Sequence, residues 1–298
     1  MVMRIFVTGA TGYVGGAVVE ALVRAGHRVT GLSRTPERDA AVRRLGAEPA
    51  RGGLGGLAAL LPLLAEHDAL VHAAVDYGLG PPADREAIDA LLAAARAGKG
   101  PRAVVYTSGV WVLGETPAPA GEGAPVDRPA AAVAWRPGHE RAVLEAGGDR
   151  IAAAVIRPGI VFGEKRGLVS PWFAGALAEG AASFVGTGAQ RWAFVHRSDL
   201  AELYRLVLER RARGIFHGVD GASPPVREAA EAASRAAGKG ATRAIPVEEA
   251  RKTMGAMADA LAMDQVVAAP RGAEVGWAPR HPPFVNDAPG AFREFRAA

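Results

Sequence analysis

Three glycines near the amino terminus have the spacing of a phosphate-binding turn. Gly9, Gly12 and Gly15 form the pattern G-x-x-G-x-x-G between an apolar, strand-like run and an amphipathic stretch. Without Cβ atoms the backbone can turn tightly and approach a pyrophosphate, while the next helix offers free N–H groups to the phosphates. A glycine-rich turn is the alternative, but a strand before and a helix after are the context that a dinucleotide site requires. We therefore predict a dinucleotide here, bound by these glycines and by Thr11, Tyr13 and Val14.

The end of the second predicted strand indicates which dinucleotide fits. An acid at this position would bind the ribose 2′-hydroxyl of NAD, but the chain has Ser33 and Arg34, and its next acid is Glu37 in the following helix. Arg34 could instead pair with the 2′-phosphate of NADP; an ordinary surface arginine is the alternative interpretation. We favour NADP(H) over NAD(H), with Ser33 and Arg34 as contacts.

Strands and helices must alternate to position these residues. The apolar patterns predict an α/β fold with a doubly wound parallel sheet covered by helices on both faces. The predicted strands are 4–9, 27–34, 68–75, 102–109 and 151–159, and the predicted helices are 13–25, 36–45, 54–66 with a break near Pro62, 83–96 and about 133–146.

The alternation breaks after Gly163, where short helices and Gly/Pro turns follow. We predict a dinucleotide-binding domain over 1–163, to which 194–220 returns, and a smaller substrate-binding region over 164–193 and 221–298. The segment 114–131 is rich in Pro and Gly and is too long for an ordinary connection, which suggests a loop near a site.

Composition excludes several functional classes. The 298 residues include no cysteine, which rules out disulfides, thiol catalysis and Cys-based metal sites, and we assign no metal ligands. The net charge of +4 comes from scattered arginines, so nucleic-acid binding is not expected. No leader and no apolar run of membrane-spanning length is evident, and we expect a cytoplasmic protein without membrane contact.

Several segments, in order, resemble the extended short-chain dehydrogenase/reductase family, the relatives of sugar epimerases and dehydratases. They are VTGATGYVG, DALVHAAV, VVYTSGVWVLG, IRPGIVFG, FVHRSDLAELYRLVLE, GIFHGVDG and VGWAP. The resemblance covers nearly the whole chain and implies a Rossmann-type fold, a dinucleotide cofactor and a carboxyl-terminal region that shapes the substrate pocket. It also implies cofactor contacts from Ala73, Ala74, Thr107, Pro158 and Gly159.

The chain departs from the catalytic pattern of that family, which uses a Tyr, a Lys four residues later, and a Ser or Thr beyond the fifth strand. The corresponding helix gives Trp135 and His139 at that spacing. His139 could bind a ribose hydroxyl or transfer a proton, although an incidental helix histidine is the alternative. Gly109 stands where the Ser or Thr is expected, and Ser108 precedes it.

Another tyrosine could replace the missing proton donor. Tyr77, next to Asp76, lies just beyond the third predicted apolar strand, at the sheet edge where substrates bind in such folds. We therefore predict Tyr77, Ser108 and His139 as catalytic candidates, with a pocket wall as the alternative for Tyr77.

Aromatic residues fall in segments that line the substrate cavity of the family, which suggests a small, largely apolar substrate; core packing is the alternative. The predicted substrate contacts are Asp76, Trp111, Trp135, Lys165 and Trp192.

Three functions remain open at this point. The first is an atypical NADP(H)-dependent oxidoreductase or epimerase/dehydratase-like enzyme acting on a carbonyl or hydroxyl compound. The second is an NADP(H)-binding sensor or regulatory protein without turnover, and the third is a non-redox cyclase, isomerase or lyase. The family also forms dimers through the helices corresponding to 83–96 and 133–145, so a homodimer is possible.

Overall fold

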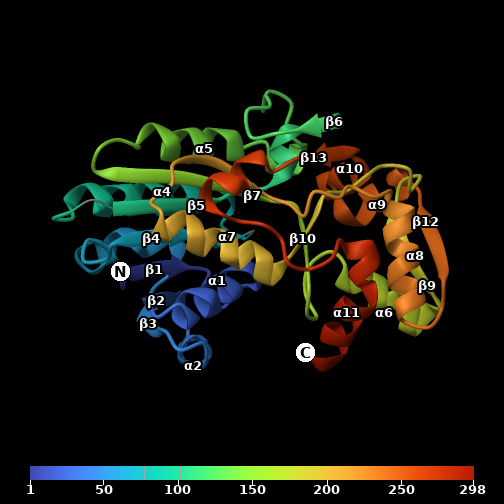
Figure 1. Cartoon of the computed structure of the whole chain (residues 1–298), viewed down its shortest axis with the longest axis horizontal. Coiled ribbons are helices and arrows are strands. Elements are labelled where there is room, and N and C mark those ends of the chain that lie inside the picture. The colour runs from blue at the N-terminus through green and yellow to red at the C-terminus, as the bar shows by residue number, and fades with distance from the viewer. Residues whose placement is uncertain (77, 101) are drawn as a thin grey trace.

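The computed structural model describes residues 1–76, 78–100 and 102–298. Within these residues, seven strands form one parallel sheet with helices on both faces (Figure 1). From edge to edge the strands are β11 (Gly214–Gly218), β7 (Ile151–Pro158), β5 (Arg102–Thr107), β4 (Ala69–His72), β1 (Arg4–Thr8), β2 (Arg28–Ser33) and β3 (Glu48–Arg51). The strand order reverses between β1 and β4. This is the doubly wound, Rossmann-like arrangement that the alternation predicts.

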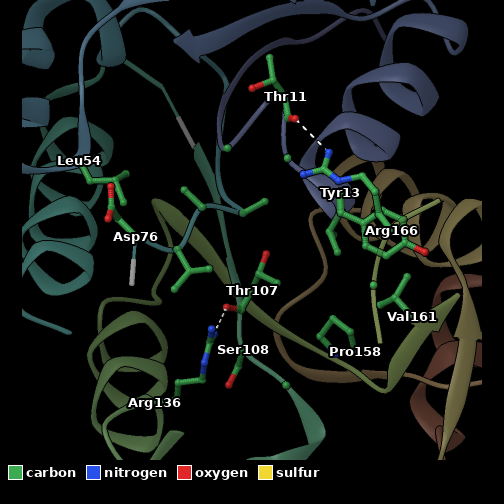
Figure 2. Close-up of a pocket in the computed structure, with 18 of the residues that line it drawn as sticks. Thr11, Tyr13, Leu54, Asp76, Thr107, Ser108, Arg136, Pro158, Val161 and Arg166 are labelled. Carbon is green, nitrogen blue, oxygen red and sulfur yellow. Dashed lines mark hydrogen bonds between the residues drawn. The ribbon is translucent and has the colours of Figure 1, made fainter. Parts of the chain in front are cut away.

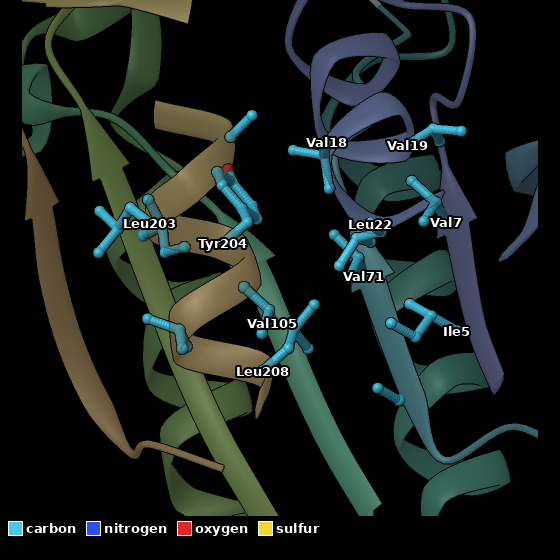
Figure 3. Close-up of a cluster of buried hydrophobic side chains, with 14 of the residues drawn as sticks. Ile5, Val7, Val18, Val19, Leu22, Val71, Val105, Leu203, Tyr204 and Leu208 are labelled. Carbon is cyan, nitrogen blue, oxygen red and sulfur yellow. The ribbon is translucent and has the colours of Figure 1, made fainter. Parts of the chain in front are cut away.

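Helices cover both faces of the sheet, so its central strands are buried on both sides. One face packs against α1 (Tyr13–Arg24), α2 (Pro36–Arg44) and α7 (Arg197–Glu209), and the other against α3 (Leu61–Leu64), α4 (Gly80–Ala97) and α5 (Arg136–Glu145). Figure 3 shows the first of these interfaces, where Ile5 and Val7 of β1 lie beside Leu22 of α1. Phe6, between them in sequence, packs on the opposite face. This explains the continuous apolar runs of the strands.

Proline positions explain two local details. The predicted helix over 54–66 is broken into a 3-10 helix, Leu54–Leu60, and α3, with Pro62 in the first turn of α3. The break near Pro62 is therefore confirmed. Strand β3 was not predicted because Pro49 interrupts its pattern, but β3 is an edge strand, where proline is tolerated.

The carboxyl-terminal region packs around its own aromatic core. Its members include Trp172, Trp192, Phe194 and Phe284. The helices here are α6 (Ser170–Glu179), α8 (Val226–Ala236), α9 (Val247–Met254), α10 (Ala256–Ala262) and α11 (Phe284–Ala297). The strands pair as β10 (Phe194–His196) with β8 (Ile160–Phe162), β12 (Ala241–Ile245) with β9 (Ala181–Val185), and β13 (Gln265–Val267) with β6 (Thr116–Ala120). The remaining 3-10 helices are Val110–Leu113, Ala131–Val133 and Pro270–Val275.

Part of the Pro/Gly-rich segment 114–131 is thus ordered as β6. Among the described residues, no helix combines the length and the apolar character needed to cross a membrane.

Candidate active site

A cavity of about 690 Å³ lies at the carboxyl ends of the sheet strands, at the point where the strand order reverses (Figure 2). This is where doubly wound sheets bind their ligands. The cavity runs from the glycine loop to the end of β5, and the turn that carries Arg166, Gly167 and Leu168 borders it. The predicted site residues that line it are Gly9, Thr11, Gly12, Tyr13, Val14, Ser33, Arg34, Ala73, Ala74, Asp76, Thr107, Ser108, Trp111, Pro158 and Gly159.

The glycine loop has a shape that side chains would disrupt. Gly9 has a φ of +69°, and a Cβ on it would lie 2.6 Å from the carbonyl oxygen of Ala73. A Cβ on Gly15 would lie 2.1 Å from the carbonyl oxygen of Gly9. Helix α1 begins directly after Gly12, with no side-chain cap and no acid in its first turn. Its first N–H groups therefore lack intrahelical partners, and the loop fits the pyrophosphate of a dinucleotide.

Two arginines line the cavity beyond β2. The guanidinium of Arg34 is 2.7 Å from Asp76 Oδ2, and 68% of the Arg34 side chain is exposed. Arg38 donates from Nη1 to the hydroxyl of Thr11 at 3.1 Å. Exposed ion pairs of this kind contribute little stability, so Arg34 can exchange Asp76 for an anionic ligand. Arg38 was missed because it lies inside α2, beyond the strand end.

Ser33 connects the cavity to an ion pair next to it. Its hydroxyl donates to the carboxylate of Asp39, which also accepts from Arg51. These hydrogen bonds, first from Arg51 and then from Ser33, hold the pKa of Asp39 below its usual range. Asp39, in α2, is therefore already partnered within the protein.

Ser108 and Arg136 line the other end of the cavity, close to β5. The hydroxyl of Ser108 is buried and has no hydrogen-bond partner in the protein. Arg136, at the start of α5, donates from Nη1 to the carbonyl oxygen of Thr107 at 2.7 Å (Figure 2). Its guanidinium also stacks on Trp135, 4.6 Å from the ring. Its other N–H groups remain available to a ligand, because a guanidinium carries five.

The remaining walls at this end are apolar. They comprise Val110, Trp111, Val133, Ile160 and Leu168. Of the three tryptophans predicted to contact a largely apolar substrate, Trp111 lines this cavity.

His139 does not line the cavity. Its Nδ1 lies 2.8 Å from Asp84 Oδ2, below the sheet edge, where His72 and the hydroxyl of Tyr106 also approach Asp84. Burial by itself raises the pKa of Asp84, but the hydrogen bonds from His139 and His72 outweigh it and hold that pKa below its usual range. Because this buried carboxylate holds the imidazole, the predicted cofactor and proton-transfer contacts of His139 have no geometric support.

Tyrosine hydroxyls elsewhere in the described residues are also engaged. Tyr13 donates to the carbonyl oxygen of Gly163 at 2.6 Å, Tyr106 donates to Asp84, and Tyr204 bonds the hydroxyl of Thr107 at 2.6 Å. Burial raises the pKa of all three. Tyr77 lies outside the described residues, and its role as the replacement acid stays a prediction.

Four other predicted contacts lie away from the cavity lining. Trp192 is stacked on Trp172 at 5.4 Å in the aromatic core, and Lys165 lies 5.6 Å from the ring of Phe295. The ring of Trp135 stacks against the guanidinium of Arg136, and Gly15 packs against the backbone of Gly9. Trp192 therefore packs in the core, as the alternative interpretation of the tryptophans proposed.

Sequence reasoning missed Arg136 and Arg166, which do line the cavity. The Tyr-Lys spacing of the family points to Trp135 and His139, which lie on either side of Arg136 in the sequence. Arg166 contacts the glycine loop, with Nη1 3.4 Å from the carbonyl oxygen of Thr11 and its guanidinium 6.0 Å from the ring of Tyr13. An arginine near the start of the predicted helix over about 133–146 was the available signal for Arg136.

Comparisons with known proteins identify the family to which this chain is similar. The sequence model described as the NAD dependent epimerase/dehydratase family matches residues 5–217. The uncharacterised protein C2A9.02 of Schizosaccharomyces pombe is 30% identical, over 96% of this chain and 98% of that protein. The 4-hydroxy-2-methyl-3-oxo-4-farnesyl-3,4-dihydroquinoline-1-oxide ketoreductase of Stigmatella aurantiaca is 31% identical, over 76% of this chain and 70% of the ketoreductase. The human epimerase family protein SDR39U1, solved with NADPH, superposes with a TM-score of 0.77 at 23% identity, over 98% of this chain and all of that chain (100%).

Proposed function

The chain belongs to the NAD-dependent epimerase/dehydratase family, whose members bind NAD(P), and from that premise we propose that it is an NADP(H)-dependent oxidoreductase reducing a small, largely apolar carbonyl compound. The observation that carries this proposal is one continuous cavity. It joins the glycine loop to a partnerless hydroxyl, Ser108, and a guanidinium, Arg136, among apolar walls. The relative from Stigmatella, which is named a ketoreductase, supports carbonyl reduction.

The residues at the β5 end suit a developing negative charge on oxygen. A reduced nicotinamide bound here would supply a hydride to the carbonyl carbon. The Ser108 hydroxyl donates a hydrogen bond to the substrate oxygen, and the Arg136 guanidinium stabilises the charge that develops there. The oxygen then takes its proton from water held by Ser108, or from Tyr77.

The test is carbonyl-dependent oxidation of NADPH by the purified chain, followed by the loss of reduced-nicotinamide absorbance. The panel pairs apolar aldehydes, aryl ketones and 3-oxo esters with polar sugars as a contrast. We expect saturable oxidation with at least one apolar carbonyl. If NADPH binds by fluorescence titration but no compound is reduced, a sensor or a non-redox enzyme replaces this proposal; if NADPH and NADH both fail to bind, all three functions are contradicted.

Cofactor preference tests the role of Arg34. Replacing Arg34 with alanine is expected to weaken NADPH binding about tenfold or more, since a charge-assisted hydrogen bond contributes about 1.5–3 kcal/mol. NADH, which lacks the 2′-phosphate, is expected to bind nearly as before. Fluorescence titrations of both cofactors measure the ratio.

Arg28, exposed at the opposite end of the same strand, provides the matched control, and Arg28→Ala is expected to change neither affinity. An equal loss for NADPH and NADH in Arg34→Ala would contradict the 2′-phosphate contact. Because Arg38 also lines this end of the cavity, Arg34→Ala/Arg38→Ala is expected to enlarge the difference.

A further inference from the structure

Two histidines and a glutamate meet outside the cavity, where the carboxyl-terminal helix approaches β10. His196 ends β10, His281 lies in the loop before α11, and Glu294 lies in α11. One ring nitrogen of each histidine and one carboxylate oxygen all lie within 4.8 Å of one another. The two imidazoles stack with their centroids 3.6 Å apart and their planes at 17°. We refer to these three residues as the His-His-Glu cluster.

Neighbouring groups indicate where the ring proton of each histidine lies. Nδ1 of His281 lies 3.1 Å from Asp199 Oδ2. An ionised carboxylate only accepts hydrogen bonds, so Nδ1 donates and Nε2 keeps its lone pair. Nδ1 of His196 accepts from the backbone N–H of Ser198 at 3.3 Å and lies 2.8 Å from the Ser198 hydroxyl, so the ring proton lies on Nε2, facing Glu294. Metal binding at Nε2 would move that proton to Nδ1, where the Ser198 hydroxyl can accept it. A histidine that donates one ring N–H to a carboxylate or other acceptor commonly binds a metal through the other nitrogen.

The third member already faces one of the rings. Oε2 of Glu294 lies 3.2 Å from Nε2 of His196 and accepts from the backbone N–H of Glu164 at 3.1 Å.

We propose that the His-His-Glu cluster binds a divalent transition-metal ion, and that Zn²⁺ matches its donors best. Two imidazole nitrogens and one carboxylate oxygen are a common zinc set, whereas Mg²⁺ and Ca²⁺ prefer oxygen alone. Bonds of roughly 2.0–2.1 Å place tetrahedral donors about 3.3 Å apart. To bind the ion, the donor atoms would move from within 4.8 Å to this spacing, and the two stacked rings would tilt so that both nitrogen lone pairs point at the metal. The orienting carboxylate of Asp199 is already in position.

The ion would join two parts of the chain beside the cofactor cavity. Gly163 has a φ of +110°, and a Cβ on it would lie 2.7 Å from Nε2 of His196 and 3.0 Å from Oε2 of Glu294. The carbonyl oxygen of Gly163 accepts from Tyr13 of the glycine loop. A metal bound here would therefore stabilise the turn that leads to Arg166.

The experiment is calorimetric titration of ZnCl₂ into the full-length, tag-free chain after chelator treatment and dialysis. We expect one saturable site per chain, with Zn²⁺ binding at least about tenfold weaker in His281→Ala and in Glu294→Ala, since each loses one metal ligand. His27→Ala is the matched control, because His27 also pairs with a glutamate, Glu209, at 3.0 Å but belongs to no candidate metal-binding group among the described residues. It is expected to bind Zn²⁺ like the wild type, and Mg²⁺ is expected to give no saturable heat.

Thermal unfolding supplies an independent measurement. Zn²⁺ is expected to raise the Tm of the wild type and of His27→Ala, but not that of His281→Ala, because a ligand that binds the folded state stabilises it. The His281 side chain is 35% exposed, so its removal is expected to leave the core intact. If His281→Ala does not fold, Glu294→Gln gives the same comparison. No saturable site, or equal affinities in His281→Ala and His27→Ala, would overturn the proposal. Both readouts are independent of catalytic activity and of the function proposed above.

Discussion

Replacing Gly15 with alanine is expected to lower the affinity for NADPH by about 100-fold, equivalent to about 2.7 kcal/mol. The new Cβ would lie 2.1 Å from the carbonyl oxygen of Gly9, a separation that real Cβ atoms do not adopt. The neighbour is backbone, so relief requires the whole turn to move away from the amino end of α1. The N–H groups that would bind the pyrophosphate then lose their alignment.

Gly16 is the matched control, since it is the next residue of the same helix. A Cβ there would lie 3.6 Å from the carbonyl oxygen of Ala10, an ordinary van der Waals contact. Gly16→Ala is expected to bind NADPH within about threefold of the wild type, because no backbone atom must move. Fluorescence titration gives both affinities, and circular dichroism establishes that each variant is folded. A folded Gly15→Ala chain that binds NADPH normally would show that this loop does not hold the cofactor.

Replacing Arg136 with alanine is expected to lower kcat/KM for carbonyl reduction about 100-fold, a loss typical of removing one group that stabilises an oxyanion. Arg136 is the basic side chain that the structure brings beside Ser108 at the β5 end of the cavity. Lysine at this position keeps the charge but not the planar fork that reaches Thr107, so Arg136→Lys is expected to recover only part of the activity.

The controls for Arg136 use the same helix. Arg141 is exposed on α5 and away from the cavity lining, and Arg141→Ala is expected to retain full activity. The backbone of α5 is held independently, because Glu140 forms a buried double hydrogen bond to Arg157, at 3.0 and 2.5 Å. The loss in Arg136→Ala is therefore expected in turnover rather than in folding. Steady-state kinetics with NADPH and the best carbonyl of the panel provide the measurement, and equal kcat/KM values for Arg136→Ala and Arg141→Ala would contradict the role.

The glycine-loop end of the cavity was largely predictable from the sequence, because its residues lie at or just after the carboxyl ends of predicted strands. The glycines, Ser33, Arg34 and the Ala73–Ala74 pair all follow strands at one edge of the sheet, and all but Gly15 line the cavity. The reaction end was less readable. Its prediction depended on a spacing rule in α5, and a shift of one residue along a helix rotates a side chain by roughly 100°.

The amino-acid sequence by itself determined the strand–helix alternation, the parallel sheet and the glycine loop, since these depend on periodicity and on glycine at particular backbone positions. Only the tertiary structure decided that Arg136 faces the cavity and that His139 is held by Asp84 instead. Only the tertiary structure brought His196, His281 and Glu294 together, where the sequence alone indicated no metal ligands. Such sites join side chains from separate elements, and their meeting depends on packing between helices, which no local pattern encodes.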